Sequence, residues 1–283
     1  MNETTPRPLA PVLPVATDGQ FKFMREKKTL YIDKTRDIYN LLTQSTRSFL
    51  FTRPRRFGKT LLISTLEELF LNNRELFRGL AIEQTDWDWT YRPVVRIDMS
   101  GIEEQMLDRI NPSLFKQIQI CANAYGILLE NNLGPKEGLR LFINLLQEKY
   151  NTLPVLLIDE YDSPLLTVLQ NPTKREVVRD HLATFYKEVK ALAPLLHLTF
   201  VTGVTFSSQV DLWSGLNHLQ DLTDSPIMAT ICGYTDEEVD KYFPGYIEQW
   251  APKRNCTPAE LRERLRRMYN GYAFCLDLPA LRV

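Results

Sequence analysis

The chain has 283 residues, of which 44% are hydrophobic and 24% charged, as is ordinary for a globular protein with one large domain and a smaller appendage. Its 34 basic and 35 acidic residues nearly cancel, so no global charge favours nucleic acid or an anionic membrane. Four dispersed cysteines and three dispersed histidines indicate neither a disulfide framework nor a structural zinc site. No apolar run reaches the roughly 18 residues of a membrane span, and without an export signal we expect a cytoplasmic protein.

Residues 1–28 are predicted to be an extended lead-in, because prolines recur there with little hydrophobic periodicity. Short β-rich runs follow at 48–52, 94–99, 155–159, 197–202 and 227–231. They are apolar at most positions, as strands covered on both faces of a parallel sheet should be. Helical patterns separate them. The alternation predicts a three-layer α/β fold of the P-loop NTPase kind, with a mostly parallel sheet of about five strands and ligands at the carboxyl ends of the strands.

The most informative motif, R-P-R-R-F-G-K-T at 53–60, joins the first predicted strand to a helix. Its last three residues match the P-loop signature G-x-x-x-x-G-K-[ST], with Arg53 in place of the first glycine. Gly58 would let the backbone approach phosphate, the Lys59 ammonium would reach the β- and γ-phosphates, and the Thr60 hydroxyl would bind Mg²⁺. A basic surface turn is the alternative for the tripeptide alone, but the strand–loop–helix setting favours the P-loop. We therefore predict nucleotide contacts from Arg53, Pro54, Arg55, Arg56, Phe57, Gly58, Lys59, Thr60 and Leu61.

An acidic pair ends the third predicted strand, at Asp159 and Glu160. In P-loop ATPases the acid at the strand end holds Mg²⁺ and the next glutamate polarises the attacking water. Asp159 is thus predicted as a metal ligand and Glu160 as catalytic together with Lys59, the alternative being solvated acids at a strand end. Asp162 is expected to cap the following helix. Asp98, at the end of the second predicted strand, fits a structural or a functional role equally.

Thr202 ends the fourth predicted strand, where ATPases of this class place a polar residue that senses the γ-phosphate, although threonine is also a good strand former. The core is expected at 29–233. The pattern at 234–283 predicts a partial helical lid that is cut short, with Thr235 and Glu238 forming a capping box. A lid helix at 259–269 carries four arginines, and a solvated face is the expected role for them.

Together these segments resemble the predicted AAA-ATPase-like family of prokaryotic P-loop ATPases, a branch close to the signalling ATPases with numerous domains. In that family R-P-R-R-F-G-K-[ST] is the usual loop. The matching segments cover nearly the whole chain after the lead-in: LPV at 13–15, YIDKT at 31–35, FTRPRRFGKT at 51–60, LIDEYD at 157–162, TGV at 202–204, SGLN at 214–217, CGYTDEEV at 232–239 and YNGY at 269–272. The resemblance implies an ATP–Mg²⁺ site with the YIDKT segment, including Asp33, on its adenine side. Many relatives continue into a C-terminal restriction-endonuclease-like domain, so an effector outside this chain is implied.

We therefore expect an ATPase that uses ATP and Mg²⁺ to switch its lid or to drive assembly. A homo-oligomer and a missing effector are open candidates for partners, whereas the chain itself indicates neither nucleic acid nor membrane. A regulatory ATP-binding module with negligible hydrolysis is one alternative: the intact Glu160 argues against it and the short lid argues for it. A small-molecule kinase ranks lower. We find no second group of acidic residues with a D…E-x-K pattern, so we expect no nuclease activity from the chain itself.

Overall fold

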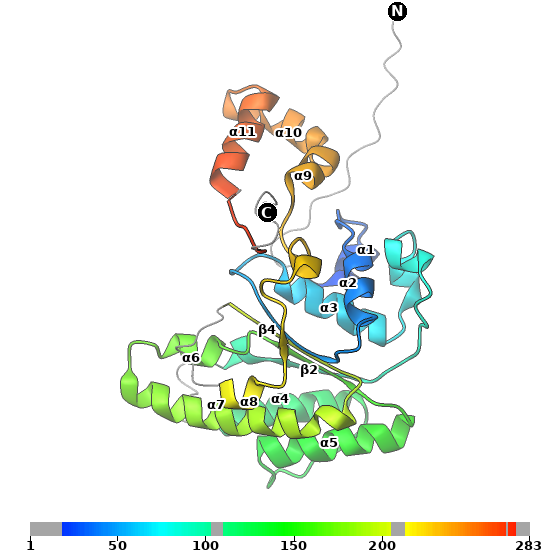
Figure 1. Ribbon diagram of the computed structural model, residues 1–283, viewed down its shortest axis with the longest axis vertical. Helices are drawn as coiled ribbons and strands as arrows, with labels where there is room; N and C mark the ends of the chain where they lie inside the picture. The colour runs from blue at the N-terminus through cyan, green and yellow to red at the C-terminus, as the bar shows by residue number, and fades with distance from the viewer. Residues whose placement is uncertain (1–18, 103–109, 205–212, 270, 276–283) are drawn as a thin grey trace, which may run out of the picture.

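The computed structural model describes residues 19–102, 110–204, 213–269 and 271–275. Its centre is a parallel sheet with the strand order β2-β3-β4-β1-β5, which confirms the predicted fold class (Figure 1). The strands are β1 (Ser48–Thr52), β2 (Val94–Asp98), β3 (Val155–Asp159), β4 (Leu198–Gly203) and β5 (Gln220–Asp221). Two short 3-10 turns, η1 (Arg74–Phe77) and η2 (Ala81–Gln84), precede β2, and a third, η3 (Met99–Gly101), follows it.

Helices cover both faces of the sheet. On one face lie α1 (Phe21–Glu26), α2 (Thr35–Leu42) and α3 (Lys59–Phe70). On the other lie α4 (Ile110–Ala124), α5 (Pro135–Tyr150), α6 (Ser163–Thr167), α7 (Pro172–Leu192) and α8 (Trp213–Leu216). Successive strand residues face opposite layers: in β3, Leu156 and Ile158 pack with α4, α5 and α7, whereas Val155 and Leu157 pack with α2 and α3. Every residue of β3 is buried, which explains why it reads as a continuous apolar run.

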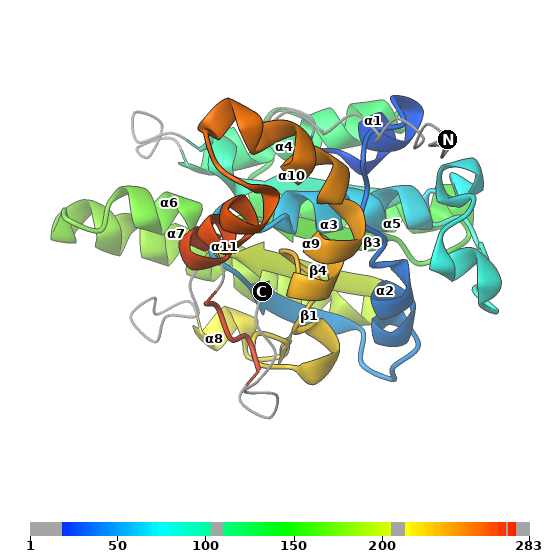
Figure 2. The ribbon, with the colours of Figure 1, turned by 90° about the horizontal axis from the view of Figure 1, so that it is seen from above.

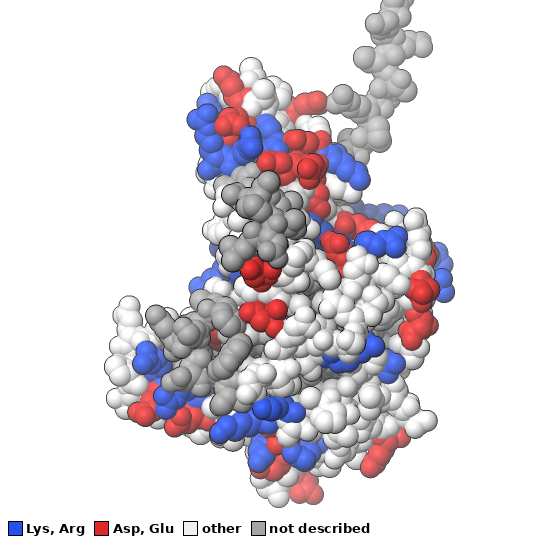
Figure 3. All heavy atoms as spheres, viewed as in Figure 1, with Lys and Arg blue, Asp and Glu red and all other residues white. Residues whose placement is uncertain are grey.

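The lid consists of α9 (Asp236–Tyr242), α10 (Pro244–Trp250) and α11 (Pro258–Tyr269), and it stands above α3 (Figures 1 and 2). The predicted capping box is present at the start of α9: Glu238 N–H donates to the Thr235 hydroxyl, and the Thr235 N–H donates to the Glu238 carboxylate. Arg262 of α11 donates to carboxylates of α9, so it is not the solvated arginine that the sequence suggested. On the face shown in Figure 3, basic and acidic side chains intermingle over the lid. Among the described residues, no helix is long and apolar enough to cross a bilayer.

The predicted fifth strand at 227–231 is wrong. A 3-10 turn, η6 (Pro226–Met228), overlaps this run, and the fifth strand of the sheet is the two-residue β5, which pairs with β1 on the side away from β4. Pro226 lacks a backbone donor and fits the first turn of a helix. Met228 and Ile231 are apolar because they are buried in the α1–α3 layer, not because they belong to the sheet.

Part of the expected lead-in is also ordered differently from the prediction. Residues 1–18 lie outside the described residues, but Phe21–Glu26 forms α1 instead of an extended chain. The Phe21 N–H donates to the Ser64 hydroxyl of α3 at 2.9 Å, and the Phe21 ring packs against Tyr31 and Phe77. This aromatic contact fixes the first helix to the core.

Arg53, which stands where a P-loop usually has its first glycine, is buried at the end of β1 with 1% of its surface exposed. Its guanidinium donates to the carbonyls of Thr223 and Met228 at 2.8 and 2.9 Å. It also lies over the rings of Phe51 and Phe274, 4.4 and 4.2 Å from their centroids. Burial lowers the pKa of Arg53 to about 10. The side chain therefore ties β1 to the segments that follow β5 and the lid.

Replacing Arg53 by methionine should lower the free energy of unfolding by roughly 2–4 kcal/mol, because the charge-assisted hydrogen bonds from the guanidinium to the carbonyls of Thr52, Thr223 and Met228 are lost. Urea denaturation followed by circular dichroism measures the change. The control is Arg55→Met, which alters an exposed side chain of the same loop and should shift the free energy by less than about 0.5 kcal/mol. Equal unfolding midpoints for the two variants would contradict the structural role of Arg53.

Candidate functional site

The loop at 53–58 joins β1 to α3 and contains two residues with left-handed backbone, Arg56 (φ 66°) and Gly58 (φ 93°). Glycine suits the second position because a Cβ disfavours this conformation. Gly58 precedes the first turn of α3, where backbone N–H groups have no intrahelical acceptor. Alternation of right- and left-handed residues before a helix N-terminus forms a concavity that binds anions. The loop therefore has the backbone of a phosphate site.

Lys59 directly follows the loop, as the first residue of α3, and is buried with 4% of its surface exposed. Its ammonium donates to the carbonyls of Arg53 and Pro54 at 3.1 and 3.2 Å, so it lies across the turn of the loop. Thr60 is exposed on the first turn of α3. An ammonium that donates to two neutral carbonyls can exchange them for phosphate oxygens, which form stronger charge-assisted bonds.

The acidic pair lies at the same edge of the sheet. Asp159 is 1% exposed at the end of β3, and its Oδ1 accepts hydrogen bonds from the Thr202 hydroxyl at 2.5 Å and from the Glu160 N–H at 3.1 Å. Its Oδ2 accepts no hydrogen bond from the described residues. Because β4 pairs with both β1 and β3, Thr202 lies between the phosphate loop and Asp159. This is the position that the sequence assigned to a γ-phosphate sensor.

Glu160 directly follows β3 with a left-handed backbone, φ 52°. Within the described part of the chain, its carboxylate makes no hydrogen bond and no ion pair. Burial raises the pKa of Glu160, and the neighbouring charge of Asp159 raises it further, while Lys59 acts in the opposite direction. A partly buried carboxylate with a raised pKa and no partner can accept a proton from water.

The two other acids near this edge have structural contacts. Asp98 is the neighbour of Asp159 across the β2–β3 pair, and its carboxylate accepts from the N–H and hydroxyl of Ser100 at 2.9 and 2.6 Å. Asp98 therefore caps the turn after β2. Asp162 occupies the N-cap position of α6, but its side chain makes no capping bond to that helix. It accepts instead from the N–H of Val204, so the capping expectation was wrong.

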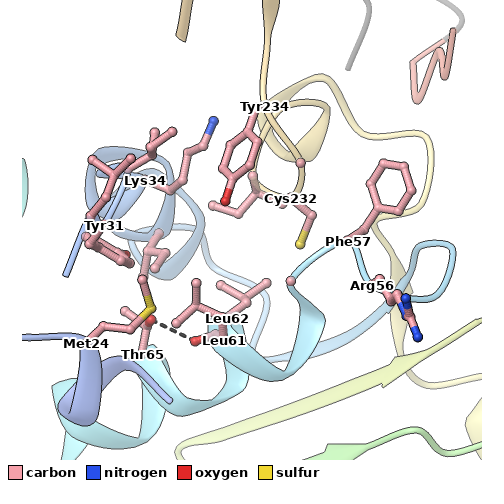
Figure 4. Close-up of a pocket in the computed structure, with 16 residues that line it drawn as sticks. Met24, Tyr31, Lys34, Arg56, Phe57, Leu61, Leu62, Thr65, Cys232 and Tyr234 are labelled. Carbon is pink, nitrogen blue, oxygen red and sulfur yellow. Dashed lines mark hydrogen bonds between the residues drawn. The ribbon is translucent and has the colours of Figure 1, made fainter. Parts of the chain in front are cut away.

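A pocket opens beside the phosphate loop, between α1–α3 and the start of the lid (Figure 4). Figure 4 shows the rings of Tyr31 and Tyr234 above the aliphatic floor of Leu61 and Leu62, with the Arg56 guanidinium directed away. The loop, α3, the chain before α2 and the chain before α9 all contribute to its lining: Tyr31, Ile32, Lys34, Phe57, Gly58, Leu61, Leu62, Ile231, Cys232, Gly233 and Tyr234 are among its residues. Aromatic and aliphatic walls of this kind suit a flat heteroaromatic ring.

Asp33 does not line this pocket, although the family resemblance placed it on the nucleotide. One of its carboxylate oxygens accepts from the N–H and hydroxyl of Thr35 at 2.8 and 2.7 Å, and the other accepts from the Ala81 N–H at 2.7 Å. Asp33 thus fastens the start of α2 to η2. Its neighbours Tyr31 and Lys34 face the pocket instead.

Phe57 of the phosphate loop makes contacts between the core and the two ends of the lid. The Gly233 N–H donates to the Phe57 carbonyl at 3.0 Å. The Phe57 ring meets the rings of Tyr272 and Phe274, with centroids 4.8 and 5.4 Å apart. Phe57 therefore contacts the chain both where it enters the lid and where it leaves. The sequence pointed to Phe57 only as a loop residue, since the partners lie far along the chain.

Lys34 forms an ion pair with Glu238, the same residue that closes the capping box of α9. Both residues fall within the matched family segments, and the capping-box pattern also marked Glu238, but neither signal indicated that the two side chains pair. On the other side of Phe57, a second groove runs between the loop and the lid, lined by Arg55, Arg56 and lid aromatics such as Phe243, Trp250 and Tyr269. The two exposed loop arginines thus face the lid.

A parallel sheet with a lysine-bearing loop after β1 and an acidic pair after β3 defines a P-loop NTPase-like fold. The model of the family described as Predicted AAA-ATPase matches residues 14–213, and the chain belongs to this family. The chain is also 34% identical over 264 residues to a protein of Azotobacter chroococcum mcd 1 described as an uncharacterized protein in the vnfD 5' region. That match covers 92% of this chain and 48% of the other protein, so the chain spans about half the length of this relative.

Lys59→Ala should weaken the binding of ATP with Mg²⁺ by roughly ten- to a hundredfold, because a charge-assisted contact to phosphate contributes about 1.5–3 kcal/mol. Isothermal titration calorimetry measures the dissociation constant. Lys136→Ala, on the exposed face of α5, is the matched control and should leave it unchanged. Unaltered affinity in the Lys59 variant would rule out the loop as the phosphate site.

Proposed function

We propose that this chain binds and hydrolyses ATP with Mg²⁺, and that the nucleotide switches the lid or drives assembly with an effector. The observation that carries the proposal is the convergence at one edge of the sheet of Lys59, the Asp159–Thr202 pair and the Glu160 carboxylate, which has no hydrogen-bond or ion-pair partner in the described part of the chain. The phosphates would occupy the loop, and the adenine ring would lie in the pocket of Tyr31 and Tyr234. Family membership supports an ATPase, and the site geometry supports the division of roles.

The oxygens at this edge fit Mg²⁺. This ion prefers hard oxygen ligands and is commonly held by one or two carboxylates together with the phosphates of a substrate. The Thr60 hydroxyl and the Asp159 carboxylate would supply the protein's share, and Asp159 Oδ2 has no competing donor among the described residues. When bound, Mg²⁺ would neutralise charge on the β- and γ-phosphate oxygens.

Glu160 would act as the general base. A water oxygen forms a bond to the γ-phosphorus as the bond from that phosphorus to the β,γ-bridging oxygen breaks. The water proton passes to the Glu160 carboxylate, and ADP and phosphate are the products. Lys59 would stabilise the charge on the transferring phosphoryl group, and Thr202 would sense the γ-phosphate.

Glu160→Gln should keep the affinity for ATP and lower turnover by roughly 10²–10⁴-fold, because an amide cannot take the proton. In the parent, turnover should rise with pH through the raised pKa of Glu160, so the acid limb lies at higher pH than for an ordinary glutamate. Phosphate release measured across a pH series tests both statements, with the exposed Glu176→Gln as control. Parental turnover in the Glu160 variant would remove Glu160 as the base.

The lid would sense the nucleotide through the phosphate loop. Phosphate binding in the loop would act on the backbone of Phe57, whose carbonyl accepts from Gly233 and whose ring packs against the chain leaving the lid. Lys34 adds a second link, from the pocket to α9. A change at the γ-phosphate therefore has a direct route to the lid.

Phe57→Ala should loosen the lid. Each aromatic pair contributes about 0.5–1.5 kcal/mol, so losing two should make amide hydrogen exchange in α9–α11 roughly 5- to 100-fold faster. Mass spectrometry of lid peptides measures the exchange. Phe23→Ala, which alters an exposed ring on α1, is the control. Identical lid exchange in the two variants would mean that Phe57 does not link loop and lid.

A regulatory ATP-binding module with negligible hydrolysis is the second candidate. The observation in its favour is the small core of the lid: among the described residues of α9–α11, only Tyr246, Ile247, Ala251 and Leu261 are buried. A lid with so small a core would not hold the bound nucleotide rigidly in the position that hydrolysis requires. Phosphate release from the purified protein, compared with the amount of bound nucleotide, separates the two candidates.

A further inference from the structure

The turn after β3 holds Glu160 in a conformation that a side chain with a Cβ avoids. Backbone hydrogen bonds fix it on both sides. The Tyr161 N–H donates to the Thr202 carbonyl at 2.9 Å, and the Ser163 N–H donates to the Glu160 carbonyl at 2.9 Å. Strained residues persist only where their surroundings over-determine them, so the source of this constraint bears on the site.

Asp162 supplies a constraint from the neighbouring strand. Its side chain is fully buried, and the Val204 N–H donates to its Oδ1 and Oδ2 at 3.2 and 3.1 Å. Val204 directly follows β4, two residues after Thr202. The carboxylate of Asp162 therefore fastens the end of β4 to the turn after β3, and a charge-assisted bond of this kind is stronger than a neutral one.

Gly203 allows the two strand ends to approach closely. A Cβ at this position would lie 2.4 Å from the Tyr161 ring and 2.8 Å from Asp162 Oδ1. On the far side, the Tyr186 hydroxyl of α7 donates to the Tyr161 carbonyl at 3.0 Å. The turn that carries Glu160 is thus held between β4 and α7.

We infer that Asp162 is a positioning residue for Glu160. By fixing Val204 it keeps the Thr202 carbonyl under the Tyr161 N–H, and this contact holds Glu160 in its left-handed conformation beside Asp159. Asp162 acts through the backbone and does not touch the nucleotide. The inference rests on the proposed role of Glu160 as base and adds a residue that controls its placement.

Turnover in two variants tests the inference. Asp162→Ala removes both acceptors and should lower kcat for ATP hydrolysis by roughly ten- to a hundredfold, because small misplacements of a reacting group have large effects. Asp162→Asn keeps the size and one acceptor for Val204, so it should recover most of the loss and keeps the test available if the alanine variant fails to fold. The dissociation constant for ADP with Mg²⁺ should stay within about twofold of the parent in both variants. Asp180→Ala, on the exposed face of α7, is the control.

A double variant separates positioning from an independent catalytic role. In the Glu160→Gln background, Asp162→Ala should cause no further loss of turnover, because the base it positions is already gone. A further tenfold loss would overturn the inference.

Amide hydrogen exchange supplies a readout that does not depend on turnover. The Tyr161 and Val204 amides, resolved by NMR, should exchange faster in Asp162→Ala than in the parent. Unchanged exchange overturns the inference even if turnover falls. If the parent protein itself releases no phosphate from ATP, the proposed function fails, and the exchange rates still decide whether Asp162 holds the turn.

Discussion

Parallel pairing of β4 with β1 on one side and β3 on the other brings three strand ends to one edge of the sheet. The end of β1 carries the phosphate loop, the end of β3 carries Asp159 and Glu160, and Thr202 at the end of β4 bridges them through its hydrogen bond to Asp159. Without this order, residues about a hundred positions apart in the chain would not lie at the same edge of the sheet. The position of the site therefore depends on the strand order, and its chemistry depends on the side chains that this order brings together.

Four strands could be predicted from the sequence almost to the residue, because buried parallel strands appear as short apolar runs between helical patterns. This pattern did not reveal β5, because its two residues, Gln220 and Asp221, are polar and exposed at the edge of the sheet beside β1. The apolar run at 227–231 misled for the opposite reason: Met228 and Ile231 are buried, although the run overlaps a 3-10 turn and forms no strand. An apolar run indicates that a segment is buried. It indicates a β-strand only where the backbone N–H groups can also pair with a neighbouring strand.

The location of the candidate site at the ends of β1 and β3 could be predicted from two short motifs, the one that carries Lys59 and the one that carries Asp159 and Glu160, and the chemical roles of these residues stay predictions. Roles that depend on distant partners could not be predicted. Arg53 looked like a phosphate ligand beside three other basic residues, yet its guanidinium contacts carbonyls 170 and 175 positions away. Asp33 and Asp162 looked like a ligand and a cap, but each fastens backbone from another element. Local sequence does not encode such contacts.

Both ends of the lid return to the same loop: Gly233 bonds to Phe57 where the lid begins, and Tyr272 and Phe274 pack on Phe57 where it ends. The lid is therefore an insertion whose two ends are held at the same residue of the loop, Phe57. The turn at 252–257, between α10 and α11, lies far from Phe57 in the lid sequence. Residues added at this turn would leave the contacts of Phe57 intact, and the entropic cost of closing the insertion grows only slowly with its length. The fold can thus accept lids of different length, or a whole inserted domain at that turn, without rebuilding the phosphate loop.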